Sequence, residues 1–413
     1  MGLIGLVVCL PLVRVGLAIL ANPAAAISDF RVYQDAAAAI SRHADPYAYY
    51  LAPVAGDPTR TGHYVYPPLL AWALRPLVQV SPLPLDIMVT LALGASLGLA
   101  IWLLAEALEF GNRRLVAAFA IATIAYFPVI QNFVWGQLNL LLLLLEVLWL
   151  RSWIGGGWRG GLALGAAISL KLLQVPCLAL VAWRRRTASL VAALAMVALL
   201  SLAASPRLLP EYVLRVLPQI GGSTGWIANM APYGTIARLI DPQSLYGLVR
   251  PPAWASLGAG LAGLGVIATT WAVLPRRAGS REARGLEAAA AIAVVPLVSS
   301  LDWPAHMVLV LPTFAVAGWW AMRRGDRTVG WMVVAAWLLT GPVSEGLWGL
   351  LDGGRVGPGP ILRVLVELPA MGVWLTWLAT LIAIRRQAAS DTHCSAAGNG
   401  GAGPLLPAGL SAG

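Results

Sequence analysis

One lysine lies inside an apolar stretch of the chain. Lys171 is the only lysine among 28 basic residues, and it interrupts the apolar run 158–183 together with Pro176. A cation within such a run is expensive to bury and marks a functional site by default. Its compact charge would suit a phosphate group. The alternative is a structural lysine that reaches the membrane interface or pairs with a buried acid such as Glu146.

Two further ionisable groups lie where apolar segments begin or end. Asp29 follows Ser28, which can cap a helix beginning there, and an acid in that position complements the helix dipole whatever else it does. His306 is the only one of the four histidines near a long apolar segment, because His43 and His63 precede residue 64 and His393 lies near the end. Residue type alone makes His306 an ordinary interfacial histidine.

The elements that must position these groups are membrane helices. The chain of 413 residues is 59% hydrophobic and only 11% charged, with a mean hydropathy of +0.76. A water-soluble fold could not hide that much apolar surface. Ten stretches are apolar and long enough to enter a bilayer. They are 2–22, 84–105, 115–130, 137–150, 188–204, 253–274, 286–300, 305–322, 328–345 and 361–384.

The run 158–183 has arginines at both ends. Arg159 precedes it and Arg184 to Arg186 follow it, so a single crossing would place basic clusters on both sides of the membrane. A re-entrant hairpin of two half-length helices that turns between Lys171 and Pro176 returns both clusters to one side. We therefore expect about 10–12 membrane-inserted helices in total.

Charge then orients the chain. With this hairpin and the amino terminus in the cytoplasm, the inner loops carry the excess of arginine, as the positive-inside rule requires. The net charge of +10 is therefore topological and predicts no nucleic-acid partner. Residues 1–387 form one transmembrane unit with outer loops at 22–84 and 205–252, and residues 388–413 are expected to be a disordered cytoplasmic tail.

The first outer loop contains two expected interfacial helices. Phe30, Tyr33, Ala37 and Ile40 recur at helical spacing on one side after Ser28. A second helix is expected to begin at the prolines after Tyr66. Both would lie on the outer face of the membrane.

Short motifs along the chain carry a family resemblance. In order they are Asp29-Phe30-Arg31-Val32-Tyr33, Asp45-Pro46-Tyr47, Tyr66-Pro67-Pro68, Gly136-Gln137-Leu138-Asn139, Lys171 with Pro176, Asn229 to Arg238, and Ser299 with Trp303 and His306. Over residues 28–312 this order resembles glycosyltransferase family 87, which contains polyprenol-phosphate-mannose-dependent mannosyltransferases and arabinofuranosyltransferases of the GT-C fold. The family often has a histidine pair after the tryptophan, whereas Pro304-Ala305-His306 leaves one histidine here.

The resemblance implies an all-α polytopic membrane protein with a GT-C-like fold. It also implies inverting transfer of a sugar from a polyprenyl-phosphate donor to an envelope glycolipid or glycan on the extracytoplasmic face of the cell membrane. Mannose is the first expectation for the sugar and arabinofuranose the second. Such transfer needs a carboxylate that takes the acceptor proton and groups that stabilise the departing phosphate. Asp29 is the expected general base.

The resemblance further implies a set of substrate-binding side chains. They are His306, Lys171, Trp303, Gln137, Asn139, Arg238, Tyr33 and Tyr66. Each has a structural alternative: Trp303 as an interfacial anchor, Gln137 and Asn139 as a polar helix start, and Arg238 as a solvated loop cation.

Other classes of site find no support in the sequence. It contains no phosphate-binding loop, dinucleotide fingerprint or metalloprotease motif, so we expect no nucleotide cofactor. The sequence contains no dense carboxylate cluster, and the three cysteines lack metal-ligand spacing, so no metal is expected. The main alternative function is a polytopic transporter or lipid flippase, which would also use an interrupted hairpin and a buried lysine. A non-catalytic assembly subunit is a third.

Overall fold

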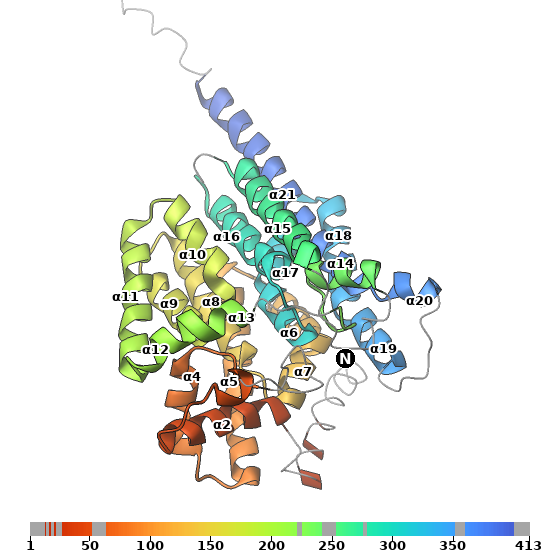
Figure 1. Ribbon diagram of the computed structural model, residues 1–413. Helices are drawn as coiled ribbons and strands as arrows, with labels where there is room; N and C mark the ends of the chain where they lie inside the picture. Colours follow the sequence, from red (N-terminus) through yellow and green to blue (C-terminus); the bar gives the residue numbers. More distant parts are fainter. Residues whose placement is uncertain are drawn as a thin grey trace, which may run out of the picture.

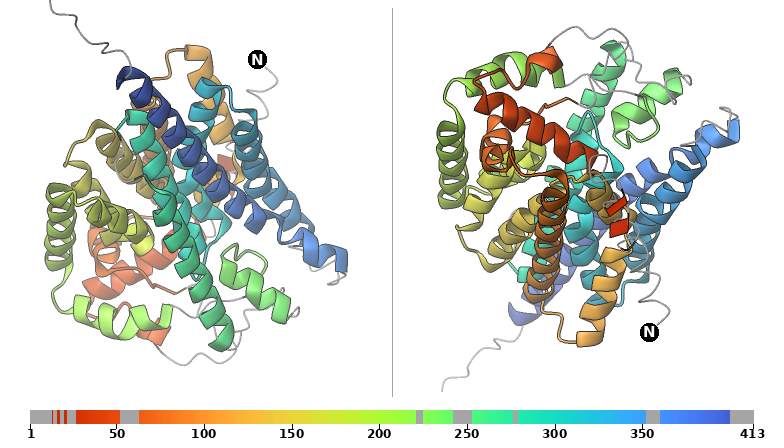
Figure 2. Two further views of the ribbon diagram at one scale, coloured as in Figure 1. Left: turned by 90° about the horizontal axis from the view of Figure 1, so that it is seen from above. Right: turned by 90° about the horizontal axis from the view of Figure 1, so that it is seen from below.

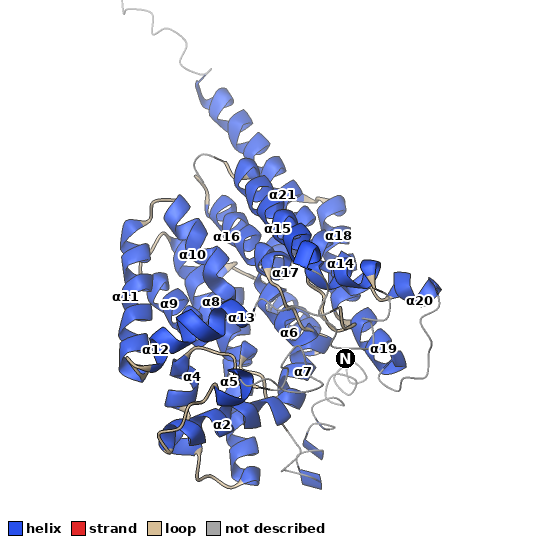
Figure 3. Ribbon diagram, viewed as in Figure 1, coloured by secondary structure: helices blue, strands red, loops and turns tan. Residues whose placement is uncertain are grey.

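The structure is a computed structural model in which the described residues form helices joined by short connections (Figure 3). It describes residues 27–51, 63–220, 225–241, 253–275, 279–351 and 360–399, together with a few single positions before residue 22. The described part contains no strand, which confirms the all-α prediction. Most of the predicted first span, 2–22, lies outside the described residues.

The first half of the chain supplies the outer helices and the hairpin (Figure 1). Its helices are α2 (Ser28–Ser41), α3 (Ala48–Leu51), α4 (Pro68–Ala73), η1 (Arg75–Leu77), α5 (Pro82–Ala107), α6 (Arg113–Ile124), α7 (Phe127–Trp135), α8 (Asn139–Gly155), α9 (Gly160–Leu170), η2 (Leu172–Gln174), α10 (Val175–Trp183) and α11 (Thr187–Ala204).

The second half begins with short helices and continues with long ones (Figure 2). They are α12 (Leu208–Glu211), η3 (Tyr212–Val216), α13 (Leu217–Ile220), α14 (Pro232–Ile240), α15 (Ala253–Val273), α16 (Arg281–Val298), η5 (Pro304–Val310), α17 (Leu311–Arg324), α18 (Arg327–Thr340), α19 (Pro342–Leu351), α20 (Pro360–Leu365) and α21 (Leu368–Asn399).

Five helical segments among the described residues are long and apolar enough to cross a membrane. They are 82–107, 187–204, 254–273, 304–324 and 363–391, and the bent pair α6 and α7 would make a sixth. The polytopic membrane prediction is thus confirmed. The larger number expected from sequence includes apolar helices too short to span a bilayer alone, such as α9, α10 and α18.

The segment around Lys171 is a hairpin, as predicted. Lys171 has extended backbone angles between the end of α9 and η2, so the chain reverses there. Near the start of α9 the Gly160 amide donates to Ser152 Oγ at 2.9 Å, and beyond α10 Arg186 Nη1 donates to the Trp153 carbonyl at 3.2 Å. Both ends of the hairpin therefore meet the last turns of α8, and Lys171 lies at the opposite end of the bundle.

Helix α2 begins where the sequence predicted, but a different residue caps it. The N-cap is Ile27 in the left-handed conformation (φ 44°), and Ser28 is exposed and makes no capping hydrogen bond. Burial of the Ile27 side chain against Gly136 sets this geometry. A Cβ at Gly136, whose own φ is 65°, would lie 2.6 Å from the Ile27 Cβ, so only glycine fits. The buried Asp86 of α5 forms an ion pair with Arg31 and fixes α2 on α5.

The second of the two helices predicted to be interfacial is α4, which begins at Pro68, close to the predicted start. At the other end of the chain, α21 continues through 388–399, which the sequence analysis assigned to a disordered tail. Gln387 explains the continuation, because it accepts from Trp320 Nε1 at 2.8 Å and donates to Asp391 at 2.9 Å. Residues 400–413 lie outside the described residues.

Close packing of α9 on α11 yields a test of the fold. A Cβ at Gly165 would lie 2.4 Å from the Ala193 carbonyl oxygen, whereas Gly98 of α5 has open space. Gly165→Ala should destabilise the protein by about 1–3 kcal/mol through overpacking. Gly98→Ala should stabilise it slightly, since alanine is the better helix former by about 1 kcal/mol. Thermal unfolding in detergent measures both, and equal midpoints would contradict this packing.

Candidate active site

Polar side chains from α2 and from the turn between α7 and α8 meet at the end of the bundle that holds Lys171. Gln137 Nε2 donates to the Asp29 carboxylate, and its Oε1 accepts from the Tyr33 hydroxyl at 3.1 Å. The Tyr33 ring packs edge-on against Tyr66, with 5.1 Å between ring centroids. Gln137 therefore holds Asp29 in a fixed orientation, and three of the predicted site residues surround this carboxylate.

The Asp29 carboxylate lies in a partly desolvated setting on α2, outside the candidate spans. Burial raises its pKa above the ordinary aspartate value, while the hydrogen bond from Gln137 and the charge of Lys171 oppose this rise. A carboxylate with a raised pKa is a stronger base than one in water, which suits proton abstraction.

Lys171 is the centre of a second cluster. Its Nζ donates to Asn139 Oδ1 at 3.0 Å, lies 2.8 Å from His306 Nε2, and is 5.1 Å from the centroid of the Tyr66 ring. The predicted alternative partner, Glu146, is not the residue that contacts it. An ammonium has three protons, and these two acceptors take two of them. No acceptor for the third proton lies among the described residues, so it is available to a ligand.

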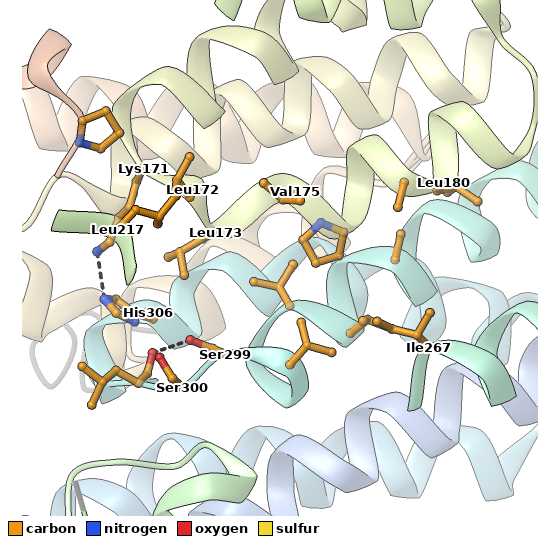
Figure 4. A pocket seen from close by; sticks show the side chains of 18 of the residues that line it. Lys171, Leu172, Leu173, Val175, Leu180, Leu217, Ile267, Ser299, Ser300 and His306 are labelled. Carbon is orange, nitrogen blue, oxygen red and sulfur yellow. Dashed lines mark hydrogen bonds between the residues drawn. The ribbon is translucent and has the colours of Figure 1, made fainter. Parts of the chain in front are cut away.

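An apolar cavity of about 480 Å³ begins at this ammonium, and Figure 4 shows Lys171 and His306 at one end of it. Tyr66, Trp303, Ser299 and Ser300 also line the cavity. Its walls come mainly from α10, α15 and α16. They include Val175, Ala179, Leu180, Ile267, Trp271, Leu274, Ala291, Val294, Val295 and Val298. The volume is that of a typical ligand pocket, and the lining suits an amphiphile with an anionic head.

The segment that carries Trp303 and His306 is held by three asparagines. Asn132 and Asn139 donate to the Ala305 carbonyl at 2.7 and 3.2 Å. Asn229 accepts from the Asp302 amide at 3.0 Å and donates to the Ser300 carbonyl at 3.2 Å. Because backbone polar groups away from water must be paired, these bonds fix the path of the chain past Lys171.

Arg238 does not line the cavity. It is buried, its Nε and Nη2 donate to the Glu367 carboxylate at 2.6 and 2.8 Å, and its Nη1 donates to the Asn229 carbonyl at 2.9 Å. It also reaches the Trp226 carbonyl, and the Trp226 ring packs on Trp303 with centroids 5.4 Å apart. Arg238 thus reaches the site through the segment it holds.

The structure therefore brings together most of the predicted site residues. Around Lys171 and the Asp29 carboxylate it gathers Tyr33, Tyr66, Gln137, Asn139, Trp303 and His306, and it leaves out Arg238. The sequence analysis gave Asp302 no role, although it is buried and its Oδ1 lies 3.5 Å from His306 Nδ1. In the sequence, the feature that could have identified Asp302 is its position four residues before His306. The described residues contain no group of three or more His, Cys, Asp or Glu placed to hold a metal ion.

The fold and site define a polytopic membrane protein with a cluster of polar side chains at one end of its helices, beside an apolar cavity. The model of glycosyltransferase family 87 matches residues 64–300, more than half of the chain. The chain belongs to this family and is a membrane glycosyltransferase.

Two curated relatives carry the same printed name. Each is an alpha-(1->3)-arabinofuranosyltransferase of Mycobacterium tuberculosis, one from strain CDC 1551 / Oshkosh and one from strain ATCC 25618 / H37Rv. Each is 25% identical to this chain over 324 residues, which cover 70% of this chain and 70% of the relative. The similarity thus covers most of this chain and most of each relative.

The position of Arg238 predicts how its loss would act. Arg238→Met leaves the half-buried Glu367 carboxylate without its charged partner, so we expect a loss of about 1.5–3 kcal/mol in stability, the value of hydrogen bonds to a charged group. The double variant Arg238→Met, Glu367→Met removes both charges and should recover part of that loss. Thermal unfolding of the three proteins in detergent is the measurement. Unchanged stability of Arg238→Met with weaker substrate binding would instead indicate a direct substrate contact.

Proposed function

We propose that this glycosyltransferase moves a sugar from a polyprenyl-phosphate donor to a hydroxyl of an envelope glycolipid or glycan, with inversion at the sugar carbon. The observation that carries the proposal is the Lys171 ammonium at the polar end of the apolar cavity. The cavity walls suit a prenyl chain, and the ammonium proton that has no acceptor in the described part of the chain suits a phosphate oxygen. Membership of the family favours this reaction over a transporter or flippase.

In the proposed reaction the acceptor oxygen attacks the sugar carbon on the face opposite the phosphate. The acceptor proton passes to the Asp29 carboxylate as the new carbon–oxygen bond forms. The electron pair of the broken bond stays with the polyprenyl phosphate, which gains one negative charge. Lys171 stabilises that added charge, because a cation in an apolar setting acts more strongly than one in water. Gln137 keeps Asp29 oriented toward the acceptor.

The distribution of arginine supports a proposal for the side of the membrane on which the active site lies. Seven arginines cluster at the end of the bundle away from Lys171. They are Arg184, Arg186, Arg281, Arg284, Arg323, Arg324 and Arg386. Since arginine collects on the cytoplasmic side, this arrangement supports an active site on the extracytoplasmic face of the cell membrane.

The proposed identity of the donor sugar rests on similarity to known proteins. The relatives are arabinofuranosyltransferases, which supports arabinofuranose as the sugar. Mannose is the sugar first expected from the family resemblance of the motifs. Both donors therefore belong in the first assay. We propose that residues 1–387 form the catalytic unit, with the outer segments at its active end.

The first prediction concerns the base. Asp29→Asn should lower transfer from polyprenyl-phosphate-arabinofuranose or polyprenyl-phosphate-mannose by about 10²–10⁴-fold, the usual contribution of a general base. Radiolabelled transfer to membrane lipid acceptors measures it. Asp35→Asn, an exposed acid on the same helix, is the matched control and should retain activity. Full activity of Asp29→Asn would remove Asp29 from the mechanism, and no wild-type transfer from either donor would reject both donors.

The second prediction concerns pH. Gln137→Leu removes the hydrogen bond that opposes the raised pKa of Asp29, so this pKa should rise further. Because the ionised carboxylate is the active form, the variant should lose activity at a higher pH than wild type as the pH falls. The acid limb of the pH–rate profile reports the shift. Gln34→Leu, which alters a glutamine on α2 away from Asp29, should leave the limb in place, and an unshifted limb in Gln137→Leu would contradict this coupling.

A further inference from the structure

Asp302 is a buried acid that the proposed reaction does not use. It lies between α16 and η5, is 2% exposed, and its Oδ2 has no hydrogen-bond partner among the described residues. Burying a carboxylate is costly unless a nearby group compensates for the loss of water. The groups next to the Asp302 side chain should therefore show what compensates for its burial.

The surroundings contain His306. Asp302 Oδ1 lies 3.5 Å from His306 Nδ1, and on the other side of the ring Lys171 Nζ lies 2.8 Å from His306 Nε2. An ammonium can only donate, so Nε2 must offer a lone pair. The proton of the neutral ring is then on Nδ1, which faces the carboxylate. Lys171 and Asp302 therefore select the same tautomer from opposite sides.

One neighbour favours the opposite tautomer. The Trp303 amide lies 3.4 Å from His306 Nδ1, where it would donate to a ring nitrogen without a proton. This hydrogen bond is long and its donor is neutral, and Asp302 Oδ1, at 3.5 Å, is no closer to the same ring nitrogen. The Lys171 ammonium, 2.8 Å from Nε2, decides between the two tautomers, because a hydrogen bond that involves an ionised partner is roughly twice as strong as a neutral one.

We propose that Asp302 is a positioning residue that keeps the His306 proton on Nδ1, so that Nε2 accepts from Lys171 and directs the remaining ammonium proton into the cavity. The inference about the tautomer stands on contacts within the free protein. Its consequence for donor binding rests on the proposed function. Without the carboxylate, the ring could carry its proton on Nε2, which would face the ammonium with a second donor and turn Lys171 away.

The backbone of Asp302 is held independently of its side chain. Its amide donates to Asn229 Oδ1 at 3.0 Å, and its carbonyl accepts from the Met230 amide at 2.9 Å. Asp302→Asn should therefore keep the segment in place while it replaces the carboxyl group with an amide. This makes the variant a test of the contact between Asp302 and His306 rather than of folding.

The experiment reads the tautomer directly. The chain has four histidines, and the substitutions His43→Asn, His63→Gln and His393→Gln leave His306 as the only one. Nitrogen-15 NMR of the full chain in lipid nanodiscs then reports which ring nitrogen carries the proton. We expect the proton on Nδ1 in this background, and a measurable population with the proton on Nε2 after Asp302→Asn. Asp35→Asn is the matched control and should leave the spectrum unchanged.

A second readout separates the inference from the proposed function. Asp302→Asn should raise the donor KM by roughly tenfold or more, the value of a lost hydrogen bond to a charged group, with a smaller change in kcat. A proton on Nε2 of His306 in the wild-type protein would overturn the inference, and so would a tautomer that Asp302→Asn leaves unaltered. The wild-type spectrum alone tests the first outcome, even if the variant fails to fold. The role of Lys171 in donor binding is tested separately with Lys171→Met. If the tautomers are as expected but this variant still binds the donor normally, the positioning of His306 is supported and the proposed donor role of Lys171 is overturned.

Discussion

The arrangement of the active end depends on holding one ammonium in an apolar interior. A lysine charge away from water needs acceptors, and the structure supplies them from segments far apart in the chain. Asn139 comes from the first turn of α8 and His306 from η5, while α9 ends at Lys171 itself. Three elements must therefore end or begin at one place. The cavity opens where these ends meet, which puts the charge at its head.

Residues that do not line the cavity also help to hold the segments around Lys171 in place. Asn229 fixes the path of the backbone through Ser300 and Asp302, and Arg238 with Glu367 fixes Asn229. On the opposite side, Arg31 and Asp86 fix α2, which carries Asp29. These side chains hydrogen-bond to one another and to the backbone of the segments they hold. Orientation at the site is thus set by packed, hydrogen-bonded segments rather than by the site residues alone.

Sequence reasoning identified the parts of this site that have a local signal. Lys171 stood out because it is a lone cation in an apolar run, and the arginines at both ends of that run predicted the hairpin. The cap at Ser28 was wrong because burial of Ile27 against Gly136, more than a hundred residues away, outweighs a local capping preference. The Glu367 partner of Arg238 is 129 residues distant and leaves no local trace. Asp302 was overlooked because an acid near a histidine has no fixed meaning until their side chains face each other.

The scarcity of lysine has a practical consequence. Since Lys171 is the only lysine, the only side-chain amine of the protein lies at the head of the cavity. Amines attack electrophilic reagents, while the guanidinium groups of the arginines remain protonated and inert. An amine-directed label placed on a side chain would therefore mark this one position without any engineering, and protection from the label would reveal when the cavity is filled.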